Sequence, residues 1–256
     1  MEVLVCVKRV PATGGRITLT DDEQEIDTRY LGFTVSPHEE CAVEEAVRIV
    51  EAHGGSTTVM TLGPLDAEEQ LREAMAIGVD RAVLLDSGGR DWDPLATASA
   101  LTEAIRVEEA ARGPFDLLLF GNESADSGGF QVGIRVAVAL GRPCVVGVKV
   151  LELRDGGVVA QREAGAGREV YEVPLPAVVA VKEGINLPRY PSVPGRLRAR
   201  KKEVERITPA WHPGGPEKVA LIVPQRDETT AEILGRGAEA APRVLDLLRQ
   251  LGLIGS

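Results

Sequence analysis

The sequence predicts an α/β protein built on a mostly parallel β-sheet. Over the first 145 residues, short runs of aliphatic and β-branched residues alternate with longer amphipathic segments, a pattern typical of parallel strands joined by crossover helices. The strand-like runs are almost continuously apolar, as expected for strands that are covered on both faces. The parallel strands are predicted at residues 3–7, 56–62, 82–85 and 115–120.

Helix signals lie between these strands. Ser36 is followed by Pro37 and, three residues on, by Glu39, which together predict a capping box at the start of a helix. Apolar residues then recur at helical spacing: Ala42, Val43, Ala46, Val47 and Val50. Further helices are predicted at 64–77, at 94–111, and from about 128–133 to Gly141.

The pattern changes after Pro143. Strands at 145–153, 158–163, 168–173 and 177–181 are predicted to be antiparallel, because glycine-containing turns separate them. Three prolines, two glycines and a cluster of five basic residues between 184 and 205 predict a long loop or extended arm. A short strand at 219–223 and a terminal helix at 230–251 follow. We therefore predict an α/β domain over 1–187 and a C-terminal arm over 188–256.

Composition excludes several classes of function. The formal net charge of −10 disfavours binding to nucleic acid or to a membrane surface. The three cysteines, Cys6, Cys41 and Cys144, are widely separated, which indicates neither a disulfide framework nor a zinc or iron–sulfur site. No apolar stretch approaches the roughly 18 residues of a membrane span. We expect a cytoplasmic protein without membrane insertion.

The sequence contains no complete catalytic motif. The three histidines, His38, His53 and His212, are far apart and form no HxxxH pair, so a metal-dependent reaction is not indicated. There is no GxSxG nucleophile elbow, and the cysteines lie in apolar or helical settings that favour inert, buried thiols. The Walker and Rossmann glycine motifs are also missing from the strand–helix context that they require.

A glycine-rich segment at 121–133 is the strongest candidate for ligand binding. It follows a buried strand and leads into a helix, so its backbone N–H groups and the helix dipole suit a phosphate group. The alternative is a tight strand–helix connection without a ligand. The candidate residues of this loop are Asp126, Ser127, Gly128, Gly129, Phe130, Gln131, Val132 and Gly133.

Several segments, taken in order, resemble the electron-transfer flavoprotein beta (small) subunit family. The resemblance extends along the chain, and its most specific element is the segment INLPRYPSVP at 185–194. The other matching segments are VLVCVKRV at 3–10, SPHEECAVEEA at 36–46, LGP at 62–64, AMAIGVDR at 74–81 and PAVV at 176–179.

This resemblance implies an adenine-nucleotide-hydrolase-like, Rossmann-like α/β fold and an electron-carrier subunit without a complete catalytic site of its own. In the family a larger alpha subunit holds the redox-active FAD, and the small subunit usually holds a structural AMP. Carried over by position, the AMP contacts would be residues 126–133 together with Cys6, Ser36, Pro37, His38, Glu39 and Leu62.

The resemblance also implies protein partners. The segment from 184 to about 205 matches the family's recognition loop, in which Val193, held between prolines, would dock onto dehydrogenases with help from Tyr190 and Pro194. Glu163 would contact the mobile flavin domain of the alpha subunit, although a surface ion pair with Arg162 is the alternative. Acyl-CoA or other flavin dehydrogenases would donate electrons, and a quinone reductase would carry them to the respiratory chain.

Two departures from the family pattern leave alternatives open. His38 stands where the family often has an aromatic residue near the flavin. The segment Phe130-Gln131-Val132-Gly133 resembles electron-bifurcating relatives that bind a second FAD in place of AMP, but their Gly-Pro and acidic context is missing around Ile134-Arg135, which favours AMP. Two rival classes are a nucleotide-binding regulator resembling the universal stress proteins, which would be a homodimer, and an adenylating enzyme, which would release pyrophosphate.

Overall fold

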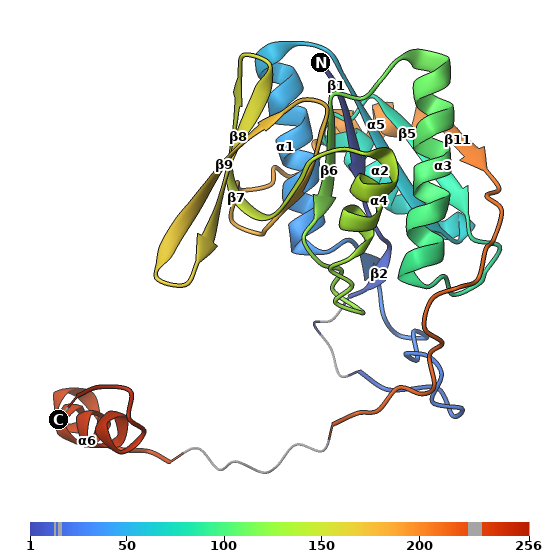
Figure 1. Cartoon of the computed structure of the whole chain (residues 1–256). Helices are drawn as coiled ribbons and strands as arrows, with labels where there is room; N and C mark the ends of the chain where they lie inside the picture. Colours follow the sequence, from blue (N-terminus) through green and yellow to red (C-terminus); the bar gives the residue numbers. More distant parts are fainter. Residues whose placement is uncertain (13, 15–16, 225–231, 256) are drawn as a thin grey trace. The chain divides into compact units, whose positions relative to one another are not determined.

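The computed structural model describes residues 1–12, 14, 17–224 and 232–255 (Figure 1). Within these ranges the main sheet has the strand order β11-β5-β4-β1-β6-β10-β7-β8-β9, and β2 (Val10–Pro11) and β3 (Phe33–Thr34) form a small separate ribbon. The strands of the main sheet are β1 (Glu2–Cys6), β4 (Ser56–Gly63), β5 (Arg81–Asp86), β6 (Leu117–Gly121), β7 (Cys144–Arg154), β8 (Gly157–Ala164), β9 (Gly167–Pro174), β10 (Ala177–Val181) and β11 (Val204–Ile207).

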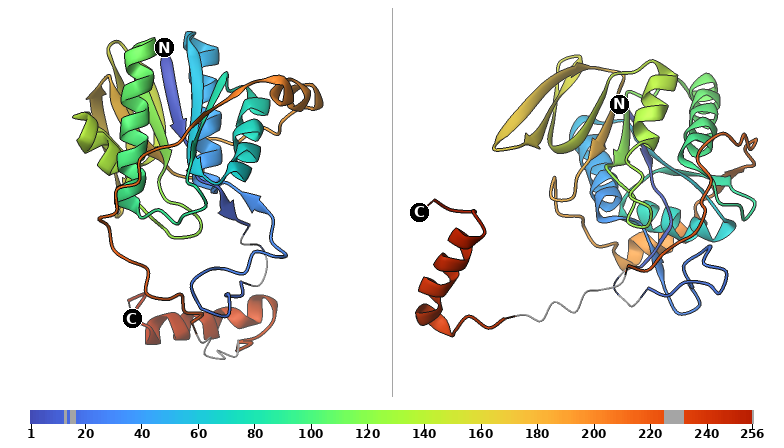
Figure 2. Two further views of the ribbon diagram at one scale, coloured as in Figure 1. Left: turned by 90° about the vertical axis from the view of Figure 1, so that its right-hand side faces the viewer. Right: turned by 60° about the horizontal axis from the view of Figure 1, so that its bottom comes forward.

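Helices cover both faces of the sheet (Figure 2). Helices α1 and α2 contribute to the hydrophobic cluster on one face, and α3 and α4 contribute to the cluster on the other. None of the helices within the described ranges combines the length and hydrophobicity needed to span a lipid bilayer. The helices and 3₁₀ turns are α1 (Pro37–His53), η1 (Leu65–Ala67), α2 (Glu68–Ile77), α3 (Pro94–Arg112), α4 (Val132–Leu140), α5 (Val193–Lys201), η2 (Gly237–Ala240) and α6 (Ala241–Gln250).

Strand directions confirm the predicted fold class. The strands from β11 across to β7 pair in parallel, whereas β8 and β9 continue the sheet as an antiparallel extension. The central parallel strands are buried on both faces, which explains their almost continuous apolar sequence.

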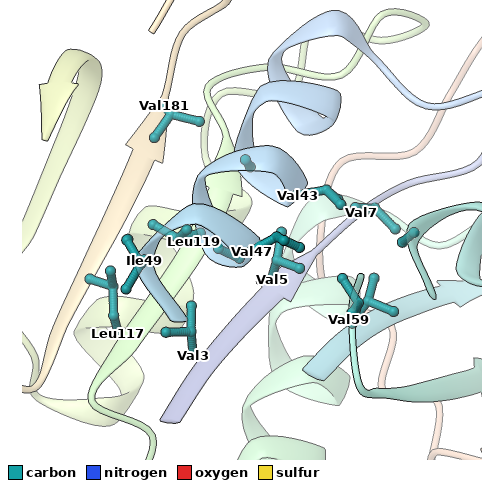
Figure 3. Packing of buried hydrophobic residues seen from close by; sticks show 14 of the residues in the cluster. Val3, Val5, Val7, Val43, Val47, Ile49, Val59, Leu117, Leu119 and Val181 are labelled. Atoms are coloured by element: carbon teal, nitrogen blue, oxygen red, sulfur yellow. The ribbon is translucent and has the colours of Figure 1, made fainter. Parts of the chain in front are cut away.

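Strands β1 and β6 pack against α1 in one of the two hydrophobic clusters (Figure 3). Side chains of each strand alternate between the two faces, so Val3 and Val5 contribute to the cluster with α1 while Leu4 contributes to the cluster with α3. The contacts around α1 thus fix the position of its first turn relative to the ends of the central strands. The residues labelled in this cluster are Val3, Val5, Val7, Val43, Val47, Ile49, Val59, Leu117, Leu119 and Val181.

The prediction that 177–181 is an antiparallel strand was wrong. β10 lies between β6 and β7 and is parallel to both. All five of its residues are buried, as expected for an inner parallel strand. The error arose because sequence order suggests pairing with the preceding hairpin, whereas the chain returns to the centre of the sheet after β9.

The stretch from 184 to 205 is more regular than predicted. Ser192 caps α5 by accepting a hydrogen bond from the Gly195 N–H (3.1 Å), and a proline lies in the first helical turn. Residues 204–207 then form β11, which pairs with β5. The prolines and glycine were interpreted as breaks, although in this order they start a helix and let it pack closely.

The C-terminal predictions have mixed outcomes. No strand is present at 219–223, all of which lie within the described part of the chain. The terminal helix is shorter than predicted, because α6 begins at Ala241 after the 3₁₀ turn η2, and the predicted start at Thr230 lies outside the described residues.

The chain forms two compact units, Met1–Ala220 and Leu221–Ser256. The predicted boundary near Leu187 falls inside the first unit, because α5 packs against α2 and β11 extends the main sheet. The role of residues 188–256 as an arm on a partner subunit stays a prediction.

Leu119→Ala tests this account of the core. Leu119 is fully buried on β6, so we expect a loss of about 2–5 kcal/mol in the free energy of unfolding. Val138→Ala on the exposed side of α4 is the control, and should change stability by no more than about 0.5 kcal/mol. Urea denaturation measures both, and equal losses would contradict the assignment.

Candidate functional site

The candidate site lies where the strand order reverses. From β1 the chain builds β4 and β5 on one side of the sheet, and then α3 returns it to β6 on the other side of β1. In doubly wound sheets ligands collect outside the carboxyl ends of the strands at such a switch point. Residues 7–9 and the glycine-rich loop at 121–133 leave the sheet here, after β1 and β6 respectively.

The carboxylate of Glu39 joins the end of β1 to the start of α1. Its Oε2 accepts a hydrogen bond from the Ser36 N–H (2.9 Å), and its Oε1 accepts one from the Lys8 N–H (2.8 Å). The Ser36 Oγ completes the predicted capping box by accepting from the Glu39 N–H (3.2 Å). The capping box therefore also ties two separate elements together.

Burial strongly affects the acids of this junction. Burial raises the pKa of Glu39 to about 7, although hydrogen bonds from Ser36 and Lys8 oppose the shift. Burial, together with the nearby Glu39 charge, also raises the pKa of the Cys6 thiol well above its ordinary value. Cys6 therefore stays protonated at neutral pH, in agreement with its interpretation as an inert, buried thiol.

β6 approaches the start of α1 very closely. A Cβ atom added at Gly121 would lie 2.6 Å from Cγ of Glu39 and 3.0 Å from its backbone nitrogen. The Ser36 hydroxyl also donates to the carbonyl oxygen of Glu123 (3.2 Å). Glycine is thus required at the exit from β6, because a side chain would separate the two walls of the crevice.

Lys8 is a site residue that the sequence reasoning missed. Its Nζ lies 2.6 Å from Oδ2 of Asp126 and 3.5 Å from Oγ of Ser127, so it links β1 to the glycine-rich loop. Burial alone would raise the pKa of Asp126, but the charge and hydrogen bond of Lys8 outweigh it and hold the pKa below its ordinary value. A cation directly after a central parallel strand was the signal that could have identified it.

The glycine-rich loop folds on itself before α4. Ser124 and Ser127 share a hydroxyl–hydroxyl hydrogen bond (3.1 Å), and the Gly128 N–H donates to the Ser124 carbonyl (3.1 Å). Gly128 has a positive φ of 60°, which glycine adopts without strain. The serines and the glycine therefore hold the loop close to the crevice.

Among the described residues, no side chain caps the backbone N–H groups in the first turn of α4. Gln131 is the N-cap but makes no capping hydrogen bond; its Oε1 instead accepts from Arg135 Nε (2.8 Å). In contrast, Ser36 caps α1 and Asp93 caps α3. An uncapped helix N-terminus beside glycines is suited to an anion.

His38 connects the crevice to the segment after β10. Its Nδ1 accepts a hydrogen bond from the Glu183 N–H (2.7 Å), which requires an unprotonated Nδ1. In the neutral ring the proton is therefore on Nε2, which donates to Oε1 of Glu123 (3.1 Å). His38 thus acts as a bridge between two segments.

The structure brings only some of the predicted nucleotide contacts together directly. The start of α1 contacts the loop at Glu123, and Lys8 contacts it at Asp126. Cys6 lies between Met60 and Phe120 in the sheet, and Leu62 lies at the end of β4. The remaining predicted contacts are Pro37 in the first turn of α1, Gly129 and the half-exposed Phe130 in the loop, and Val132 and the buried Gly133 at the start of α4.

A separate hollow of about 660 Å³ lies between α2 and α5, and Arg9, Arg72 and Arg200 are part of its lining. Its lining includes none of the residues predicted to bind the nucleotide. Glu68 in its wall accepts hydrogen bonds from both Arg72 and Arg206, so part of the positive charge of the hollow is paired internally.

No group of three or more residues able to hold a metal ion is found among the residues that the structure describes.

Comparison with known proteins identifies the family. The model of the electron transfer flavoprotein domain matches residues 25–211. The electron transfer flavoprotein subunit beta of Bacillus subtilis is 31% identical and covers 97% of this chain and 98% of its own length. The protein of the same name from Thermoanaerobacterium thermosaccharolyticum is 32% identical and covers 99% of this chain and 100% of its own length. The protein of that name from Mycobacterium leprae is 37% identical and covers 80% of this chain and 78% of its own length.

The chain belongs to the electron transfer flavoprotein family. The residues predicted to bind partners of such a flavoprotein lie away from the crevice in the sequence. Tyr190 is exposed in the segment leading into α5, and Val193 and Pro194 are exposed in the first turn of α5. Glu163 is exposed on β8 with its carboxylate 3.8 Å from Nζ of Lys149, while the guanidinium of Arg162 pairs with Glu169 instead (2.6 Å).

Gly121→Ala tests the close approach of β6 and α1. The added methyl group would collide with Glu39, so we expect the free energy of unfolding to fall by about 1–3 kcal/mol. Gly32→Ala is the matched control, because its added Cβ would meet nothing within 4 Å. Thermal and urea denaturation measure both variants, and an unchanged Gly121→Ala variant would refute the tight junction.

The pKa of Glu39 predicts a specific pH dependence of stability. Because this pKa rises from 4.5 to about 7 on folding, the contribution of the protonated carboxyl is fully present below 4.5 and is lost as the pH rises through about 7. Between pH 5 and pH 8 the stability of the wild type relative to Glu39→Gln should therefore fall by about 2 kcal/mol. Parallel pH profiles for the two proteins, measured by urea denaturation, would argue against this ionisation.

Proposed function

We propose that this chain is the small subunit of a heterodimeric electron transfer flavoprotein. It carries AMP in the crevice at the ends of β1 and β6, and pairs with a large subunit that holds most of the FAD site. Electrons from acyl-CoA or other flavin dehydrogenases pass through the heterodimer to a quinone reductase. The chain itself is a redox carrier subunit without a catalytic site.

The observation that carries the nucleotide proposal is the convergence of the two loops at the switch point. Lys8 after β1 contacts Asp126 after β6, and the start of α1 contacts Glu123 in the same loop. A crevice walled by a glycine-rich loop at this position is the usual nucleotide site of a doubly wound sheet. The family relationship supports the same assignment.

The residues present fit a phosphate group. The uncapped N–H groups at the start of α4 would donate to phosphate oxygens, and the glycines at 128 and 129 permit close approach of the backbone, whereas Gly133 lets α4 pack on Phe120. Lys8 would neutralise part of the phosphate charge, while Asp126 holds the ammonium group in position. Glu39 has both carboxylate oxygens engaged by backbone groups, so its role is to shape the crevice.

Two of the cysteines also support the proposal of an electron carrier that depends on a bound cofactor. The thiol of Cys6 is buried with a raised pKa, and burial raises the pKa of Cys144 to about 11. These thiols are therefore poor nucleophiles and poor redox groups at neutral pH. When bound, FAD would supply the redox chemistry. The residues of this chain would bind the structural nucleotide and help to orient the flavin and shield it from water.

The exposed segment around Val193 would dock onto the electron donor. Tyr190 is 96% and Val193 is 73% exposed, and large apolar side chains presented in this way are suited to partner binding. After Val193, helix α5 carries the cations Arg196, Arg198 and Arg200. These cations would complement acidic residues around the docking pocket of the electron donor. Glu163 is exposed on β8, where its carboxylate lies 3.8 Å from Nζ of Lys149, and would face the flavin domain of the large subunit.

Cofactor content tests the proposed function. We expect the heterodimer, produced by co-expression with its large subunit, to release one FAD and one AMP on denaturation, because this crevice takes the nucleotide and the partner takes the flavin. Chromatography of the released nucleotides against standards measures the ratio.

Two other outcomes would contradict the proposal. Two FAD molecules per heterodimer would favour the electron-bifurcating alternative suggested by Gln131-Val132-Gly133. A homodimer without flavin would favour a regulator resembling the universal stress proteins, although relatives that match 97–99% of the chain already weigh against it.

A further inference from the structure

The segment between β10 and α5 is attached to α1 at regular intervals. The Glu183 N–H donates to Nδ1 of His38 (2.7 Å), and three residues on, the side-chain amide of Asn186 donates to the carbonyl oxygen of Cys41 (3.0 Å). Three residues further, Arg189 binds Glu44. Residues 183, 186 and 189 thus contact residues 38, 41 and 44, and we call this set of contacts the ladder.

The last contact of the ladder is the strongest. Nε of Arg189 lies 2.9 Å from Oε2 of Glu44, and Nη2 of Arg189 lies 3.0 Å from Oε1 of Glu44. The same guanidinium makes a second bidentate contact with Glu51 at 2.7 and 2.9 Å, and the Arg189 N–H also donates to Glu44 (3.1 Å). Glu44 is buried, with 4% of its surface exposed. Because its guanidinium group forms bidentate ion pairs with both Glu44 and Glu51, the side chain of Arg189 is held in a single orientation.

Two large apolar side chains beside these attachment points face solvent. Leu187 is 91% exposed and Tyr190 is 96% exposed, although Asn186 and Arg189 beside them are held on α1. Prolines at 188 and 191 restrict the backbone further. The apolar side chains are therefore displayed on a segment that is fixed at every third residue.

The other end of the segment is also fixed. α5 packs on α2 at Gly195, where an added Cβ would lie 2.4 Å from the carbonyl oxygen of Ala76. Arg72 NH1 donates to the carbonyl oxygens of Ala199 (2.7 Å) and Lys202 (3.2 Å). Only residues 190–192 separate the ladder from α5, so the connection is short and held at both ends.

We propose that the ladder is the device that positions the partner-docking residues, and that Arg189 is its decisive positioning residue. This inference rests on the proposed docking function of the segment. By holding residues 183–189 on α1, the ladder presents Tyr190 and Val193 in one arrangement to an apolar pocket with an acidic rim on the electron donor. Docking then orders few groups, and less conformational entropy is lost.

The ladder also places docking and nucleotide binding on one helix. α1 starts at the crevice with Ser36, and its next turns carry Cys41, Glu44 and Glu51. His38 contacts both Glu123 in the glycine-rich loop and Glu183 at the start of the segment. The position of α1 therefore determines the geometry of both sites.

The test uses the heterodimer and an acyl-CoA dehydrogenase from the same organism. Arg189→Gln alone leaves the buried Glu44 without its partner and can fail to fold, so the main variant is the neutral pair Glu44→Gln with Arg189→Gln. The control pair is Glu152→Gln with Arg154→Gln, which removes one acidic and one arginine side chain from an exposed ion pair on β7. Hydrogen exchange of amides 184–192 and steady-state electron transfer are measured for each.

We expect the main variant to raise the KM of the dehydrogenase for the flavoprotein about tenfold, because the loop must be ordered on docking. The value of kcat should stay within about twofold, because the reacting cofactors are untouched. Exchange of the loop amides should become faster, and the control pair should behave like the wild type. Unchanged exchange together with unchanged KM would overturn the proposal.

A double-mutant cycle with Val193→Ala shows whether Arg189 acts through the docking residues. If it does, Val193→Ala raises KM in the wild type but has a smaller effect once the ladder is broken. Additive effects would overturn the positioning role. If Val193→Ala alone leaves KM unchanged, the docking function itself fails, and the exchange rates then decide separately whether the ladder holds the segment.

Discussion

The arrangement of this protein depends on a buried carboxylate at the start of α1. Glu39 accepts hydrogen bonds from the backbone of Lys8 and of Ser36, and so joins the end of β1 to the helix that follows. Backbone N–H groups buried at such a junction need a partner, and one carboxylate supplies two. Burial of this carboxylate raises its pKa. β6 approaches the side chain of Glu39 so closely that only glycine fits at position 121.

From this junction the crevice follows. The Ser36 hydroxyl reaches the carbonyl of Glu123, and Lys8 reaches Asp126, so the glycine-rich loop is attached to both β1 and α1. The start of α4 follows the same loop without a side-chain cap, so its backbone donors are available. A switch point of a doubly wound sheet becomes a candidate nucleotide site because these few contacts hold the loop open in a defined shape.

Helix α1 links the crevice to the segment at 183–194. Its apolar stripe packs on β1, β6 and β10, so the helix cannot move without disturbing this cluster of buried side chains. Its first turn borders the crevice, and its polar flank holds Asn186 and Arg189. A rigid helix anchored in the core is a suitable base for two sites, since side chains on packed elements are held more accurately than those on free loops.

Short-range signals in the amino-acid sequence specify the local elements. The central strands, the capping box at Ser36 and the glycine-rich loop all have signals that act over a few residues, namely apolar runs, caps and turns, and their positions agree with the structure to within a few residues. The order of the segments that resemble the flavoprotein family also pointed to the correct family.

Which of these elements meet depends on long-range contacts that became visible in the folded chain. The insertion of β10 between β6 and β7, the ion pair of Lys8 with Asp126, and the attachment of Arg189 to Glu44 all join residues that are far apart in the chain. The helix α5 was missed for a related reason, because Gly195 is favourable there only through close packing on α2. Such contacts depend on long-range geometry, which periodicity and capping signals do not encode.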